Sequence, residues 1–153
     1  MVGSDRLVDS GYMRAKVAQE KLIVASGLPY SLVHATQFFE FITGIAATST
    51  VGDEVRLTHA PVQPIAAEDV ATEVARVAVG EPLDGTVEIA GPERMGLDEF
   101  VRTGLTFRND PRAVVTDPES PYFGAHPDEF TLVPSDGATI FETRLVDWLP
   151  ANS

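Results

Sequence analysis

The chain has 153 residues, a length typical of one domain with a sizeable core. Its formal net charge of −12 argues against binding to nucleic acid or to an anionic membrane surface, since both would repel it. The absence of cysteine excludes disulfides and thiolate metal sites, and no apolar run approaches the roughly 18 residues of a membrane helix. With no apolar signal core near residue 1, a cytoplasmic location is expected.

Apolar spacing and breakers predict helices and strands in alternation. The predicted elements are a helix over 12–26, a strand over 30–36, a helix opening at 38 and fading by 50, a strand over 55–58, an extended segment over 61–65, a helix over 68–79, a strand over 86–90, a helix over 97–108, a strand over 113–116 and a helix over 139–149. Residues 117–137 are rich in Pro, Asp and Gly and are expected to be irregular. The alternation predicts an α/β fold, a parallel sheet with covering helices, in one domain over residues 1–153.

The first helix has clear end signals. Ser10 or Asp9 is a suitable N-terminal cap, and Gly27 is a C-terminal stop. Small and apolar residues recur at helical spacing and predict its buried face: Ala15, Ala18, Leu22 and Ala25.

Tyr12 and Lys16 form a Tyr-x-x-x-Lys pair in this helix. Residues four apart lie on the same helix face, and a nearby ammonium group favours the phenolate form of a tyrosine. Such a pair suits proton transfer to or from a carbonyl oxygen while a hydride moves, and the lysine can also hold a ribose hydroxyl. The alternative is a surface tyrosine beside a solvated lysine, because the spacing also arises by chance.

Other chemistries have little support in the sequence. His34, His59 and His126 are isolated from one another and from suitably spaced carboxylates, so no metal site is expected. His34 falls in an apolar segment, where a core histidine is the usual interpretation. No Gly-x-Ser-x-Gly elbow and no phosphate loop is present.

The order of the motifs resembles that of a known superfamily. A helix with Tyr-x-x-x-Lys is followed by Gly-Leu-Pro, an apolar strand and an aromatic-rich helix start. This order is similar to that of the short-chain dehydrogenase/reductase superfamily, and in particular to its atypical NmrA-like and nucleoside-sugar-epimerase-like branch. Three further stretches resemble that branch: His34 to Phe41, Gln63 to Ala71, and Glu88 to Glu93 followed by Leu97 to Phe100.

The resemblance implies a Rossmann-type domain that binds NAD or NADP, with a small subdomain on the substrate side. It implies that Tyr12 is the acid/base and that Lys16 is its partner and a ribose ligand. The cofactor-binding backbone after the strand would comprise Ala35, Thr36, Gln37 and Phe38. The pocket for a small-molecule substrate would be lined by Phe38, Phe39 and Phe41, although the residues alone leave plain core packing as the alternative for these rings.

The resemblance covers only the C-terminal portion of the family's domain. The Gly-x-x-Gly-x-x-Gly loop that approaches the pyrophosphate is absent, as is the residue that reads the adenosine ribose. The family's catalytic serine would fall at or before Met1, and Ser4 and Ser10 lie too close to Tyr12 for that role. We therefore expect an N-terminally truncated domain, in which the strand near residues 30–35 has an unpaired edge and an uncovered face, and exposed apolar surface favours self-association.

Three functional hypotheses remain. The first is an NAD(P)-dependent oxidoreductase or epimerase-like protein that is weakly active or inactive as this chain alone, with negligible NAD(P) affinity. The second is a non-catalytic NmrA-like dinucleotide-sensing regulator or binding module. The third is a remnant without autonomous activity. The substrate, the reaction direction and the choice between NAD and NADP are not encoded in any motif that we identify.

Overall fold

The computed structural model describes residues 1–152, which form an α/β fold of five α-helices, one 3-10 helix and eight strands. In chain order these are α1 (Gly11–Ala25), β1 (Ser31–Ala35), η1 (Phe39–Phe41), α2 (Ile42–Thr48), β2 (Thr50–Val51), β3 (Glu54–Leu57), β4 (Pro61–Val62), α3 (Ala67–Ala78), β5 (Gly85–Ala90), β6 (Met95–Gly96), α4 (Leu97–Phe107), β7 (Ala113–Thr116), β8 (Thr139–Ile140) and α5 (Leu145–Ala151). The predicted alternation is confirmed, with most boundaries close to those expected.

The predicted helix over 139–149 is wrong in its first half. Thr139 and Ile140 form β8, which pairs in parallel with the end of β5. The helix begins only at Leu145, because Arg144 has an extended backbone and its guanidinium is held 2.7 Å from a carboxylate oxygen of Glu93. An ion pair between residues 51 positions apart in the sequence thus holds the residue that precedes the helix.

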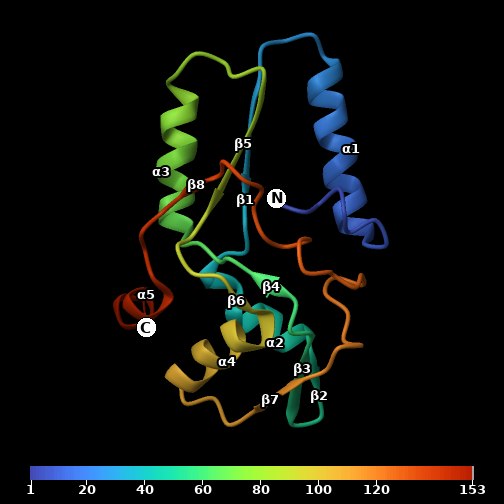
Figure 1. Ribbon diagram of the computed structural model, residues 1–153, viewed down its shortest axis with the longest axis vertical. Helices are drawn as coiled ribbons and strands as arrows, with labels where there is room; N and C mark the ends of the chain where they lie inside the picture. The colour runs from blue at the N-terminus through green and yellow to red at the C-terminus, as the bar shows by residue number, and fades with distance from the viewer. Residues whose placement is uncertain (153) are drawn as a thin grey trace.

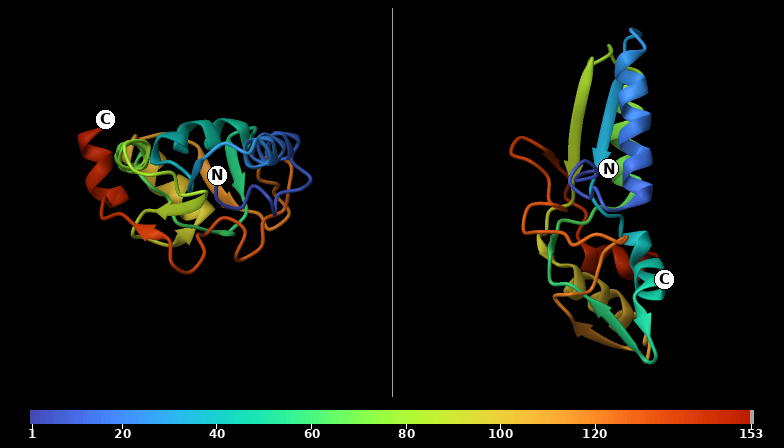
Figure 2. Two further views of the ribbon diagram at one scale, coloured as in Figure 1. Left: turned by 90° about the horizontal axis from the view of Figure 1, so that it is seen from above. Right: turned by 90° about the vertical axis from the view of Figure 1, so that its right-hand side faces the viewer.

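A parallel sheet in the order β1-β5-β8 forms the upper part of the molecule. Figure 1 shows α1 on one side of this sheet and α3 on the other, and the view from above in Figure 2 shows the same flanking arrangement. β1 pairs with β5 along one edge, and no strand among residues 1–152 pairs with its other edge. The expected unpaired edge is therefore present, whereas the expected uncovered face of β1 is not, because α1 and α3 cover its two faces.

The predicted buried face of α1 is wrong. Its four members are all exposed, and Leu22 is 75% exposed. Met13 is instead the buried residue of the helix, and Glu20 faces the sheet, where its carboxylate lies 2.9 Å from Nε2 of His34. The Ser10 cap is present, since its hydroxyl accepts a hydrogen bond from the Met13 amide. The apolar side of α1 has no cover within residues 1–152, and self-association stays a prediction.

The larger hydrophobic core lies in the lower part of the molecule in Figure 1. There α2 and α4 pack with a three-stranded sheet in the order β2-β3-β7, in which β2 is antiparallel and β7 parallel to β3. The strands β4 and β6 form a separate antiparallel pair. A smaller core around Ala35, Ile65 and Ile89 joins the parallel sheet to α3. Among the described residues, no helix combines the length and the apolar character needed to cross a membrane.

Candidate functional site

Tyr12 and Lys16 are in contact on the first turns of α1. The Nζ atom of Lys16 lies 5.7 Å from the centroid of the Tyr12 ring, within the range of a cation–π interaction. Tyr12 is 56% exposed, and Lys16 is half-buried. The proximity expected from the four-residue spacing is therefore present, with the ammonium group over the ring of the tyrosine.

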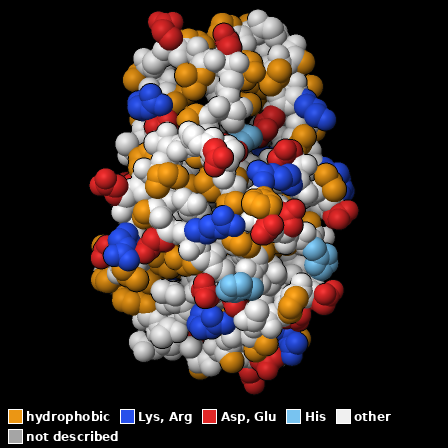
Figure 3. Space-filling view, viewed as in Figure 1, with side chains coloured by type: hydrophobic (Ala, Val, Ile, Leu, Met, Phe, Trp, Pro, Cys, Tyr) orange, Lys and Arg blue, Asp and Glu red, His pale blue; other side chains and the backbone are white. Residues whose placement is uncertain are grey.

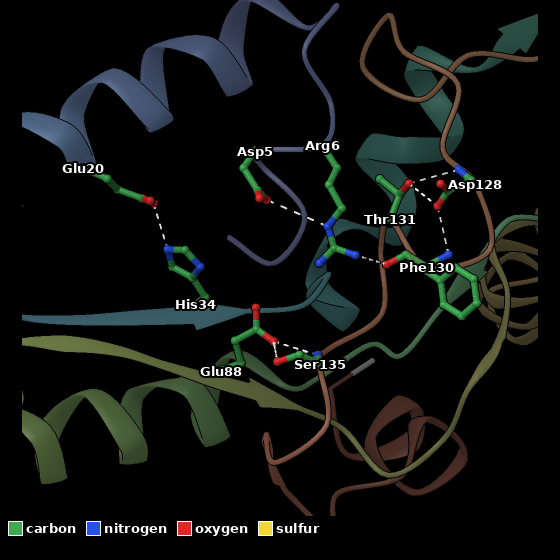
Figure 4. Close-up of polar contacts among 9 residues, drawn as sticks. All are labelled: Asp5, Arg6, Glu20, His34, Glu88, Asp128, Phe130, Thr131 and Ser135. Carbon is green, nitrogen blue, oxygen red and sulfur yellow. Dashed lines mark hydrogen bonds and ion pairs between the residues drawn. The ribbon is translucent and has the colours of Figure 1, made fainter.

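The pair lies toward the carboxyl end of β1. Figure 4 shows Glu20 on α1 reaching His34 on β1. Because α1 and β1 run in opposite directions (Figure 1), the helix residues before Glu20 lie beyond this contact, toward the end of the strand. In open α/β sheets, ligands bind outside the carboxyl ends of parallel strands. Tyr12 and Lys16 therefore occupy the end of the sheet where a ligand would be expected.

A strained turn holds a second aromatic ring against Tyr12. The Phe123 ring stacks on Tyr12 with centroids 6.1 Å apart, and its edge contact with Tyr122 has a centroid distance of 4.7 Å. Phe123 has a φ of 51°, a left-handed conformation that is unusual for a bulky residue and costs on the order of 1–3 kcal/mol. Burial raises the pKa of the Tyr122 phenol, so this neighbouring tyrosine stays protonated. Of the two tyrosines that contact Phe123, Tyr12 of α1 is thus the one whose phenol is accessible.

The backbone at the carboxyl ends of β1 and β5 is held in place by side chains. The Thr36 hydroxyl donates to the backbone carbonyl of Gln63 at 2.6 Å. The side-chain amide of Gln63 donates in turn to the backbone carbonyl of Gly91 at 2.8 Å. A Cβ on Gly91 would lie 1.9 Å from the Pro64 carbonyl oxygen, so only glycine fits there. Together with the bond from the Thr36 amide to the Ile89 carbonyl, these contacts make the strand ends a rigid support.

Gln37 carries a buried amide without a partner. The residue is 2% exposed, and neither Oε1 nor Nε2 of its side chain has a hydrogen-bond partner. Its backbone carbonyl, by contrast, accepts from the Ile65 amide at 2.9 Å. Leaving a buried polar group unpaired costs about 1–3 kcal/mol, and such groups in folded proteins need an explanation. This polar group fits a ligand that brings its own hydrogen-bonding atoms to the end of β1.

The three phenylalanines predicted to line a pocket have different surroundings. Phe39 is buried in the larger core, with ring centroids 5.5 Å from Trp148 and 6.3 Å from Phe100. The rings of Phe38 and Phe41 stack on each other at 5.2 Å, and Phe41 is exposed. The packing alternative therefore describes Phe39 fully and Phe38 in part, since Phe38 is half-buried against the smaller core. Phe41 is the exposed ring of the three.

The segment from Asp128 to Ser135 crosses the carboxyl end of the sheet (Figure 4). The Glu88 carboxylate of β5 accepts hydrogen bonds from the amide and the hydroxyl of Ser135, each at 2.7 Å. The Arg6 guanidinium donates to the Phe130 carbonyl. These contacts tie the segment both to the sheet and to the residues that precede α1.

The sequence analysis missed a polar cluster around Asp98, at the start of α4. Its carboxylate is 3% exposed and accepts from His59 Nδ1 at 2.7 Å, from the Thr116 hydroxyl at 2.5 Å and from Arg102 Nη2 at 3.3 Å. Burial acts to raise the pKa of Asp98, but the hydrogen bonds from Thr116 and His59 outweigh it, and the pKa lies below its usual value. The imidazole packs on Gly96, where a Cβ would lie 2.4 Å from Nδ1.

Surface hollows and charges give no further site. A hollow of about 450 Å³ is lined by residues of α4 and α5, and a second one of about 320 Å³ is lined mainly by residues of α3 and β1. Neither hollow is lined by a predicted site residue. On the face in Figure 3, acidic and basic side chains are scattered among apolar ones. Within residues 1–152, no three His, Asp or Glu side chains gather to hold a metal ion.

Comparison of the sequence with protein-family models and with curated proteins gives no match. The resemblance to the short-chain dehydrogenase/reductase superfamily therefore depends on the sequence motifs alone.

Proposed function

We propose that this chain forms the nicotinamide-side part of an NAD(P)-dependent oxidoreductase of the short-chain dehydrogenase/reductase type, with a Rossmann-type sheet. The contact between Tyr12 and Lys16 carries the proposal, because it joins an acid/base group to a cation near the carboxyl end of a parallel strand. Helices on both faces of the sheet and the unpartnered amide of Gln37 support it.

Each predicted residue has a role in this proposal. The Tyr12 hydroxyl gives a proton to a substrate carbonyl oxygen, or, in the reverse direction, the Tyr12 phenolate takes one from the corresponding alcohol. The Lys16 ammonium holds a ribose hydroxyl and stabilises negative charge on the phenol oxygen. When bound, NAD(P) supplies or accepts the hydride. The backbone from Ala35 to Phe38 supports the nicotinamide, and Phe38 and Phe41 contact a small apolar portion of the substrate.

The chain by itself is expected to bind the dinucleotide weakly. It contains no Gly-x-x-Gly-x-x-Gly spacing, so no backbone loop of that kind is available to the pyrophosphate. Affinity should then come from the nicotinamide half alone and lie near the millimolar range, with turnover weak or absent. The adenosine half should add little.

The two lysines of the chain, Lys16 and Lys21, provide the test. We would label lysine selectively with ¹³C and titrate nicotinamide mononucleotide or adenosine monophosphate while recording NMR spectra. We expect the mononucleotide to shift the Lys16 signal, adenosine monophosphate to shift neither signal, and Lys16→Met to weaken binding about tenfold. Lys21→Met, on the same exposed helix, is the matched control and should bind normally. Unchanged spectra at millimolar mononucleotide would reject the proposal.

A non-catalytic dinucleotide-sensing module is the second candidate. The packing of Tyr12 against both Lys16 and Phe123 favours it, since these contacts give the ring a structural role without proton transfer. Tyr12→Phe keeps the ring and removes the hydroxyl. Measurable turnover by the wild-type chain that Tyr12→Phe abolishes, with mononucleotide binding kept, would identify an oxidoreductase. The sensing module should show no turnover in either form and equal binding in both.

A further inference from the structure

Phe123 occupies a turn position that a bulky side chain does not suit. The amide of Tyr122 donates to the carbonyl of Ala125 at 2.8 Å, and the amide of Ala125 donates to the carbonyl of Tyr122 at 3.1 Å. Phe123 and Gly124 therefore form a two-residue hairpin loop, with φ values of 51° and 81°. A loop of this kind needs a positive φ at both residues, and Asn-Gly is the usual choice. Within residues 1–152, the other non-glycine residues with a positive φ are an aspartate and an asparagine, which tolerate it.

Burial does not account for the strained phenylalanine. Phe123 is 54% exposed, so it is not held in place by a surrounding core. Its ring stacks on Tyr12 with an angle of 24° between the planes, and it meets the buried Tyr122 edge-on. A strained conformation of this kind persists where function requires it. The turn thus presents an accessible apolar ring beside the accessible phenol of Tyr12.

The surface that the turn offers to a ligand is apolar. The loop residues Phe123 and Gly124 carry no polar side-chain atom, and Ala125 beside them is buried. The main-chain amides and carbonyls of Tyr122 and Ala125 are already bonded to each other. A sugar or another polyhydroxylated substrate would gain no hydrogen bond from these groups. An aromatic ring, by contrast, gains stacking energy on Phe123 beyond that of its buried area.

We propose that Phe123 is a specificity-determining residue that stacks on an aromatic ring of the substrate, and that the substrates are aryl ketones or aryl aldehydes. This inference rests on the proposed function, in which Tyr12 exchanges a proton with the carbonyl oxygen. Because the rings of Phe123 and Tyr12 stack on each other, a carbonyl group held at the Tyr12 hydroxyl places its substituent within reach of Phe123. Phe123 itself takes no part in proton or hydride transfer.

The first measurement concerns the free protein. Phe123→Asn introduces the residue that this turn prefers, so the relief of backbone strain should outweigh the lost ring contacts and raise the melting temperature by about 3 °C. The matched control is Phe130→Asn, because Phe130 is 58% exposed and lacks the positive φ. It should change the melting temperature by less than about 1 °C. A larger fall for Phe123→Asn than for Phe130→Asn would mean that the ring is kept for packing, and would overturn the proposal.

The second measurement concerns the ligand. The chain has three tyrosines, so selective ¹³C labelling of tyrosine and lysine gives NMR reporters at Tyr12 and Lys16. Acetophenone and cyclohexyl methyl ketone, which are similar in size but differ in aromaticity, would be titrated separately in the presence of millimolar nicotinamide mononucleotide. Wild-type chain should bind acetophenone about fivefold more tightly, as measured at the Tyr12 signal. Phe123→Asn should lose this preference, and Phe130→Asn should keep it.

The outcomes separate this inference from the proposed function. If the mononucleotide shifts the Lys16 signal but wild-type chain binds the two ketones equally, or binds neither, the role of Phe123 is overturned and the proposed function stands. A preference for acetophenone that persists in Phe123→Asn has the same meaning. If the mononucleotide leaves the Lys16 signal unchanged, the proposed function is overturned, and the inference with it.

Discussion

Substitution of Asp98 by asparagine should destabilise the protein through loss of a buried charge. The carboxylate accepts hydrogen bonds from His59, Thr116 and Arg102. An asparagine side chain has only one acceptor oxygen, so its NH₂ group would face at least one of these three donors. Hydrogen bonds to a charged group each contribute about 1.5–3 kcal/mol, but His59 and Arg102 are well exposed to solvent, which reduces their part. We expect a loss of about 2 kcal/mol in the free energy of unfolding.

The loss should depend on pH in a defined direction. The pKa of Asp98 in the folded protein lies below its ordinary value of 3.8. A carboxylate with a lowered pKa stabilises the fold above the unfolded value, and this stabilisation disappears as the pH falls through the folded value. The difference between wild type and Asp98→Asn should therefore be larger at pH 5 than at pH 3. Contributions of the other carboxylates cancel in that difference.

Urea denaturation followed by circular dichroism and by Trp148 fluorescence would measure both effects. At pH 7 the expected loss corresponds to a fall in melting temperature of about 4–8 °C. Asp53→Asn, in the exposed turn between β2 and β3, removes the same charge and should change stability by less than about 0.5 kcal/mol. A loss at Asp98 no greater than at Asp53, or a difference that grows toward pH 3, would refute the reasoning.

Two further predictions concern the larger core. Phe39→Ala should cost about 3–5 kcal/mol, because the ring is 2% exposed and packs on Phe100 and Trp148, and native Trp148 fluorescence should change with it. Gly104→Ala should cost about 1–3 kcal/mol despite the higher helix propensity of alanine, since its Cβ would lie 2.6 Å from Ile42 side-chain atoms. Adding Ile42→Val should recover part of that loss in a double-mutant cycle, and strict additivity would show that the contact does not matter.

Local signals in the sequence predict most of the helices and strands. The features that they do not predict, β8 and the buried side of α1, depend on contacts between segments that are distant in the sequence. The helices α3 and α4 have acidic first turns and regular apolar spacing, and both lie close to the predicted ranges. β8 could not be predicted, because two residues form a strand only where β5 offers them an edge. On α1 the spacing of apolar residues does not identify the side that faces the sheet. That side is defined by the burial of Met13 and by the contact between Glu20 and His34.

The same distinction applies to the site. The proximity of Tyr12 and Lys16 is predictable, because a four-residue spacing fixes it within one helix. The cluster of His59 and Asp98 joins residues 39 positions apart, and no local pattern predicts it. The burial of Gln37 is likewise not indicated by any local pattern in the sequence.

Gln37 and Asp98 are both almost completely buried polar side chains, yet they should respond to an apolar or neutral replacement with opposite signs. Asp98 has every expected partner, so its removal should weaken the fold. Gln37 has none, so its removal should strengthen the fold. Sequences that specify a structure usually satisfy such groups, and positions where they do not are commonly functional. A stabilising Gln37→Met beside a destabilising Asp98→Asn would therefore identify the end of β1, and not the start of α4, as the place where stability is given up for binding.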